Sequence, residues 1–181
     1  MRLSRKLAVL VFLMATSLTA TAQCMRPVEG AAPAISLSIK AVETTVVSGS
    51  EVKVAVTLTN SSSHNIRVWS HNDSDDDRGY RVNVRDDTGA FAPDTKRGIA
   101  RNGRGDISSL TAEELTRYGT VVSGACGVLK SGTSLSYFVT ATRLYGLSKP
   151  GKYTVQLECL DEESKTYVKS NTVTVTITAK R

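Results

Sequence analysis

The stretch VKVAVTLT at residues 52–59 decides the fold class, because an apolar residue stands at every second position. Successive side chains of a β-strand point to opposite faces, so this pattern is typical of a strand with one buried and one solvated face. The alternation recurs at residues 35–39, 80–84, 135–139, 153–159 and 173–177, and residues 66–70 form a further candidate strand. With about seven to nine strands, the sequence predicts an all-β fold of antiparallel sheets.

The phase of the alternation predicts which side chains face the core. In the run at 135–139 the inward set is Leu135, Tyr137 and Val139, and in the run at 153–159 Cys159 shares the inward phase. Gly- and Ser-rich turns separate the runs, for example Ser48-Gly49-Ser50.

One short helix is predicted at residues 110–117, where Thr111 precedes Glu114 by three positions in a capping-box pattern. Residues 142–147 are expected to form a single turn. The surrounding segment, residues 93–119, is rich in Gly and Arg and is otherwise interpreted as an irregular loop.

The N-terminus has the pattern of an export signal. Arg2, Arg5 and Lys6 precede a nearly continuous apolar run at residues 7–18, and Ala20-Thr21-Ala22 supplies an A-x-A cleavage site. The apolar run is too short to remain as a membrane anchor. We therefore expect a signal peptide over residues 1–22, a flexible tail over 23–33 and one domain over 34–179, in a secreted or periplasmic protein. The alternative is a lipid anchor on Cys24, although Gln23 departs from the usual lipidation motif.

Composition limits the classes of partner that the protein is expected to bind. Removing residues 1–22 takes three of the 23 basic residues and none of the 17 acidic ones, so the net charge falls from +6 to +3. This balance does not favour nucleic-acid binding, and no stable membrane insertion is expected after cleavage. The expected partner is an envelope or extracellular protein or glycan.

The cysteines leave two possibilities open. In an exported protein a bridge between Cys126 and Cys159 would stabilise the fold by about 3–4 kcal/mol. The alternative is two buried thiols that act as small apolar residues.

The final third of the chain resembles the tyrosine corner of immunoglobulin-like and fibronectin-like β-sandwich modules. Leu147 and Gly151 stand six and two residues before Tyr153 in LSKPGKYTV. The resemblance implies an immunoglobulin-like Greek-key sandwich in which the Tyr153 hydroxyl bonds backbone a few residues upstream. The motif spacing is also similar to that of the intracellular proteinase inhibitor family.

Metal binding is a minor alternative at two places. Asp73, Asp75 and Asp77 could wrap a calcium ion, but the spacing departs from an EF-hand loop and favours a solvated acidic hairpin. His64 and His71 would need a third ligand to hold zinc. We predict no metal and no cofactor.

A run of positive charge without an intervening acid, formed by Lys96, Arg97, Arg101 and Arg104, is a candidate contact for an anionic partner. An exposed loop without a ligand is the simpler interpretation.

For catalysis, the best nucleophile is Cys126, but neither histidine stands in a motif that would place it as a base, and we predict no enzyme. The sequence thus favours an exported, non-catalytic binding or assembly module. The alternatives are a protease inhibitor and a cysteine-dependent envelope enzyme.

Overall fold

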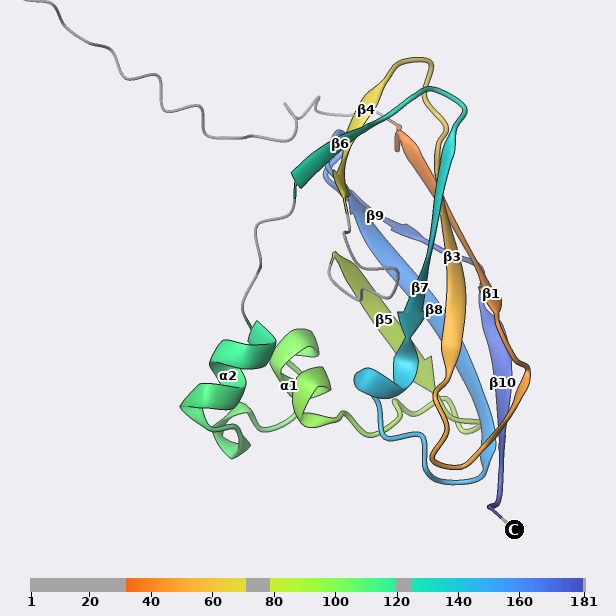
Figure 1. The fold of residues 1–181 in the computed structure, drawn as a ribbon, viewed down its shortest axis with the longest axis vertical. Helices are drawn as coiled ribbons and strands as arrows, with labels where there is room; N and C mark the ends of the chain where they lie inside the picture. Colours follow the sequence, from red (N-terminus) through yellow and green to blue (C-terminus); the bar gives the residue numbers. More distant parts are fainter. Residues whose placement is uncertain (1–31, 71–78, 120–124, 181) are drawn as a thin grey trace, which may run out of the picture.

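The computed structural model describes residues 32–70, 79–119 and 125–180 (Figure 1). These residues form ten strands, two α-helices and two short 3-10 helices. The elements are β1 Ile35–Ala41, β2 Thr45–Val47, β3 Lys53–Asn60, β4 Ile66–Ser70, β5 Tyr80–Arg85, α1 Lys96–Asn102, η1 Ile107–Ser109, α2 Ala112–Gly119, β6 Ala125–Leu129, β7 Ser134–Thr140, η2 Ala141–Arg143, β8 Gly151–Asp161, β9 Thr166–Lys169 and β10 Val173–Thr178. No helix in these ranges has the length and apolar character needed to cross a membrane.

The strands form two main sheets and a two-stranded ribbon. One sheet has the order β1-β3-β7, and the other has the order β2-β10-β8-β5, with β9 also paired to β8. All of these pairs are antiparallel except the short parallel pair of β2 and β10. The ribbon consists of β4 and β6. The fold is therefore mostly β, as the alternating runs predict.

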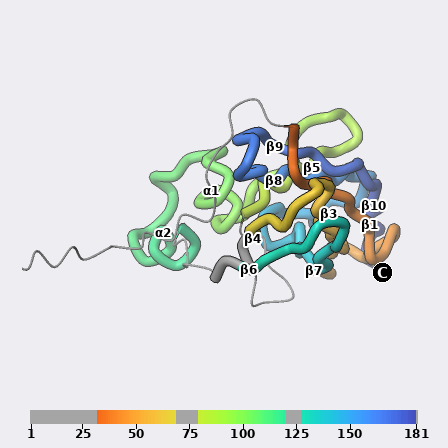
Figure 2. Tube along the Cα trace, turned by 90° about the horizontal axis from the view of Figure 1, so that it is seen from above, coloured from red at the N-terminus to blue at the C-terminus, as the bar shows by residue number. Residues whose placement is uncertain are grey.

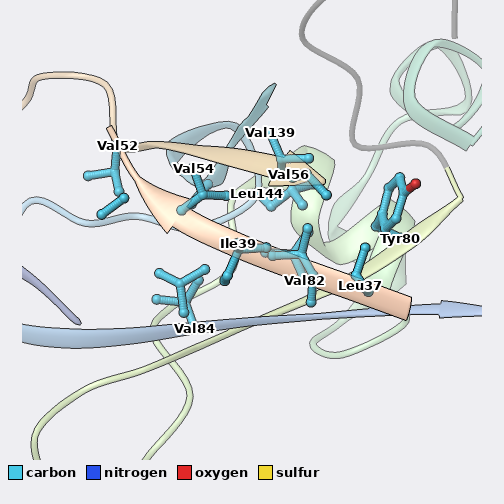
Figure 3. Close-up of a cluster of buried hydrophobic side chains, with 14 of the residues drawn as sticks. Leu37, Ile39, Val52, Val54, Val56, Tyr80, Val82, Val84, Val139 and Leu144 are labelled. Carbon is cyan, nitrogen blue, oxygen red and sulfur yellow. The ribbon is translucent and has the colours of Figure 1, made fainter. Parts of the chain in front are cut away.

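A single apolar core joins the two main sheets. Side chains from β1 and β3 meet those from β5 and β8, as the close-up shows for Ile39, Val56 and Val82 (Figure 3). Val54, Val84 and Val155 are all 0% exposed, so the inward phase predicted for their strands is confirmed. Burial of these branched side chains supplies the main stabilisation of the fold, at about 25 cal/mol per Å² of apolar surface.

The predicted phase of β7 is only partly correct. Val139 is fully buried and Tyr137 is half-buried, but Leu135 is 38% exposed. β7 is the last strand of its sheet, so within the described residues only its β3 side is covered. An edge strand therefore exposes an apolar residue that alternation alone assigns to the core.

The predicted element count is also too low. The structure has two α-helices where one was predicted, because residues 96–102 form α1 instead of a loop. The strand count exceeds the predicted range because β2 and β9 are only three and four residues long. Both helices lie beside the sheets, with α2 outermost (Figure 1 and, from above, Figure 2).

The expected signal peptide lies outside the described residues, as does all of the expected tail except Ala32 and Pro33. The core cluster begins at Ala34 and ends at Ile177, which lies within the domain limits predicted from the sequence.

Candidate functional site

The most distinctive surface is a helical insert, residues 93–119, which joins β5 to the later strands. Its first helix, α1, begins with Thr95, whose Oγ1 accepts a hydrogen bond from Gly98 N at 3.1 Å. Thr95 N donates to the carbonyl oxygen of Leu144 at 2.9 Å. The helix ends at Gly103, where φ is 62° and the N–H bonds Ile99 O. A side-chain cap and a left-handed glycine thus define both ends.

Gly98 allows α1 to approach the body of the protein. It is buried in the middle of the helix, and a Cβ at this position would lie 2.0 Å from the carbonyl oxygen of Leu144 and 2.8 Å from Asp94 Oδ1. Glycine costs about 1 kcal/mol relative to alanine inside a helix. At this position the absence of a side chain lets the α1 backbone contact the backbone at Leu144.

Arg104 fixes the far end of α1 to the sheet. Its guanidinium donates to the Tyr145 hydroxyl and, at 3.3 Å, to Asn83 Oδ1. Arg104 Nε lies 3.8 Å from Asp94 Oδ2. The Tyr145 hydroxyl in turn donates to the carbonyl oxygen of Val82 at 2.5 Å. This chain of bonds links the insert to the β5 backbone, and burial raises the pKa of Tyr145.

Phe91 completes the base of the insert. The guanidinium carbon of Arg104 lies 4.0 Å from the ring centroid, and that of Arg85 lies 3.8 Å from it. Asn102 Nδ2 adds a 2.7 Å hydrogen bond to Asp94 Oδ1. Cation–π contacts and side-chain hydrogen bonds therefore hold α1 in one position.

The second helix, α2, is held differently. Glu114 N donates to Thr111 Oγ1 at 3.1 Å, and Thr111 N donates to Glu114 Oε2 at 2.9 Å, so the predicted capping box is confirmed. Lys96 Nζ lies 2.6 Å from Glu114 Oε1, and this bond, followed by that from Thr111, lowers the pKa of Glu114. No residue of α2 is buried. Leu115 is 37% exposed and the nearby Ile107 is 56% exposed.

The proposed anion-contact run does not form one free surface. Lys96 pairs with Glu114, and Arg104 packs on Phe91 at the base of the insert. Arg97 and Arg101 lie half-buried on α1. The interpretation of this run as a loop was wrong, because residues 96–102 form α1, which packs closely against the Leu144 carbonyl at Gly98. The Gly and Arg content alone gave no signal for the contacts of Arg104.

The tyrosine-corner residues lie together at the start of β8. The Tyr153 hydroxyl donates to the carbonyl oxygen of Lys149 at 2.9 Å, which is the bond expected from the motif. Leu147 is buried, and Gly151 begins the strand. These residues stabilise the turn that precedes β8.

Cys159 is half-buried and packs against the core. Burial raises its pKa to about 11, so little thiolate forms near neutral pH. The Cys126 side chain lies outside the described residues, and the proposed bridge stays a prediction. On the adjacent strand, burial raises the pKa of Tyr80, whose hydroxyl bonds that of Tyr137.

Of the candidate metal ligands, only His64 lies in the part of the chain that the structure describes. His64 Nε2 lies 3.1 Å from Glu163 Oε2. No group of three or more potential ligands occurs there. The calcium candidates Asp73, Asp75 and Asp77 and the second histidine, His71, lie outside the described residues.

Comparison with known proteins adds no family. No protein-family model matches the sequence, and no curated protein matches it. The class that the fold defines is a mostly β protein with a helical insert anchored beside its sheets. The insert is the candidate functional site, because it combines a fixed base with an exposed outer helix.

Proposed function

We propose that the chain is an exported, non-catalytic binding module with an immunoglobulin-like β-sandwich fold. Its helical insert contacts a protein or glycan of the cell envelope or extracellular space. The observation that carries this proposal is that α2 buries no residue, although Arg104 and Gly98 hold the base of the insert rigidly.

The strand order supports an immunoglobulin-like sandwich. The constant-type fold places strands A, B, E and D in one sheet and C, F and G in the other. Here β1, β3 and β7 stand in the order of A, B and E, and β5, β8 and β10 stand in the order of C, F and G. Position D has no counterpart among the described strands. The chain between β5 and β7 instead carries the helical insert and β6.

The exposure of α2 supports a binding role. Isolated helices as short as α2 are marginal in water, and most helices in proteins are stabilised by burying an apolar face. Ile107 and Leu115 are apolar residues that this protein leaves substantially exposed. A partner that covers them would supply the missing burial.

Two further features support the rest of the proposal. The basic residues, apolar run and Ala20-Thr21-Ala22 at the N-terminus are the elements of an export signal. The raised pKa of Cys159 supports a structural role for that thiol over a nucleophilic one.

Site-specific photo-crosslinking in intact cells tests the contact surface. A photoreactive phenylalanine analogue at position 115 is expected to form a discrete adduct, whereas the same group at Ser38, on β1, is not. Ile107→Glu should abolish the adduct, because a charge replaces the apolar contact. Ala112→Glu is the matched control: it adds the same charge to an exposed position in the first turn of α2, and the adduct should persist. Absence of any adduct at position 115 would contradict the proposal.

A further inference from the structure

The outer strands of the two sheets differ in how their free backbone groups are protected. A free strand edge presents unpaired backbone N–H and C=O groups that can pair with another chain, so proteins usually protect such edges. On β1 the protection comes mainly from Asn171, which lies between β9 and β10. Asn171 Oδ1 accepts from Ile39 N at 2.8 Å, and Asn171 Nδ2 donates to Ile39 O at 2.9 Å. Asp161 Oδ2 accepts from Ala34 N at 3.1 Å.

The edge of β5 is protected as well. Ala92 N donates to the carbonyl oxygen of Val84 at 2.9 Å, and the Tyr145 hydroxyl donates to that of Val82. The other outer strands of that sheet, β2 and β9, are only three and four residues long. Very short edge strands are themselves a form of protection.

β7 differs from these strands. Ala141 N donates to Val52 O, and Asn60 N donates to Thr133 O, so the odd-numbered residues of this segment bond β3. Because backbone direction alternates along a strand, Ser134, Ser136 and Phe138 direct their N–H and C=O groups away from β3. No described strand pairs with that side.

The sequence of β7 also lacks the usual edge defences. Residues 134–140 contain no charged residue and no proline, and their register with β3 is unbroken over seven pairs. Phe138 is 42% exposed and Leu135 is 38% exposed, on opposite faces of the strand. Lysine, proline or a bulge at such an edge would discourage pairing, and β7 has none of them.

We propose that β7 pairs antiparallel with β7 of a second copy of this chain, about a two-fold axis at Ser136. In this register each outward-directed residue meets another, because Ser134 lies opposite Phe138 of the second copy. The exposed Leu135 then lies beside Tyr137 of the second copy, in the closely spaced type of pair. A second copy fits this edge because β7 carries no charge and can therefore pair with its own sequence without like-charge repulsion. A charged partner segment would find no opposite charge on β7 with which to form an ion pair.

Pairing at β7 stops at two copies. The two-fold contact uses the same edge of both copies, so each β7 edge is occupied once the pair has formed. The product is therefore a closed dimer and not a fibre. This inference does not involve the helical insert, so Ile107→Glu is expected to leave dimerisation unchanged, and failure of one proposal does not entail failure of the other.

Charge substitution at the axis tests the dimer. The chain is expressed from Met1, purified after any processing and examined by analytical ultracentrifugation, where the wild type should sediment as a dimer. In Ser136→Lys and in Ser136→Glu the introduced charge lies opposite the same charge on the second copy. Association should therefore weaken by about 100-fold. An equimolar mixture of the two variants should form a one-to-one heterodimer, since opposite charges then meet at the axis. That recovery also shows that each variant is folded.

Ser38→Lys is the matched control, because it adds the same charge to an exposed serine of β1, the protected edge of the same sheet. It should remain dimeric. A wild type that is monomeric at its highest soluble concentration would overturn the proposal, as would open-ended association. A dimer unchanged by both charges at position 136, or variants that fail to recover on mixing, would overturn it equally.

Discussion

The two helices of the insert are similar in length but are held in place by different means. α1 contacts the body of the protein through Gly98 and is followed by Arg104, whose side chain reaches Tyr145 and Phe91. α2 has its own capping box and contacts α1, including through the ion pair from Lys96 to Glu114. The comparison shows how a protein can present an exposed helix: α1 is fixed to the sheets, and α2 is held by its own cap and by contacts with α1.

This difference has a consequence for stability. Contacts that join an element to the core break only with global unfolding, whereas contacts within one helix can open locally. Substitutions at the base of α1 should therefore lower the free energy of unfolding of the whole domain. Equivalent substitutions in α2 should change only the local stability of that helix.

The largest effect is expected from Gly98→Ala. The new Cβ would overlap the carbonyl oxygen of Leu144, so α1 must move away from the body. We expect a loss of about 3 kcal/mol in the free energy of unfolding, measured by chemical denaturation. The control is Gly119→Ala in α2, where no atom lies within 4 Å of the added Cβ. Equal effects of the two substitutions would remove the distinction between the helices.

Arg104→Ala is the next largest change. It removes the hydrogen bonds to Asn83 and the Tyr145 hydroxyl together with the contact on Phe91, and we expect a loss of about 2 kcal/mol in global stability. Arg104→Lys should recover only part of this, because an ammonium lacks the planar fork of the guanidinium. The control, Arg117→Ala on the exposed face of α2, should change stability by less than about 0.5 kcal/mol. An unchanged free energy of unfolding in Arg104→Ala would contradict the anchoring role.

Thr111→Ala should act locally. Loss of the cap leaves Glu114 N without its acceptor and is expected to cost about 1 kcal/mol within α2. Amide hydrogen exchange should show faster exchange over residues 112–119, while exchange in β3 and β8 remains unchanged. Thr111→Ser keeps the hydroxyl and is the control. Faster exchange across the core strands would show that α2 is coupled to the body after all.

The smallest expected effect is a pH dependence of α2. The bond from Lys96, followed by those from Thr111, lowers the pKa of Glu114 below its usual value of 4.5. A carboxylate with a lowered folded-state pKa stabilises the fold above its unfolded pKa, and this stabilisation is lost as pH falls through the folded value. The protection of the α2 amides, taken relative to their intrinsic exchange rate at each pH, should therefore fall as the pH is lowered below 4.5. Glu114→Gln should remove this dependence, and its persistence in the variant would assign it to another group.

The sheets and α2 could be predicted from sequence for the same physical reason. Alternation of apolar residues and a Thr–Glu cap are local patterns whose energetic basis lies within a few residues. The signal for α1 is not local. Lys96-Arg97-Gly98 carries a glycine in the helix interior and has no apolar period, so propensity argues against a helix. Arg104 could be recognised as basic, but not as the residue that packs on Phe91.

By itself the sequence determined that this protein is mostly β, which side chains of the central strands are buried, and where α2 begins. Those properties follow from the period of the chain and from caps closed within one helical turn. Only the tertiary structure decided that α1 forms, that Asn171 protects β1, and that β7 keeps a free side among the described strands. These outcomes depend on contacts between residues far apart in the chain, such as the 132 positions that separate Ile39 from Asn171, and no local pattern encodes them.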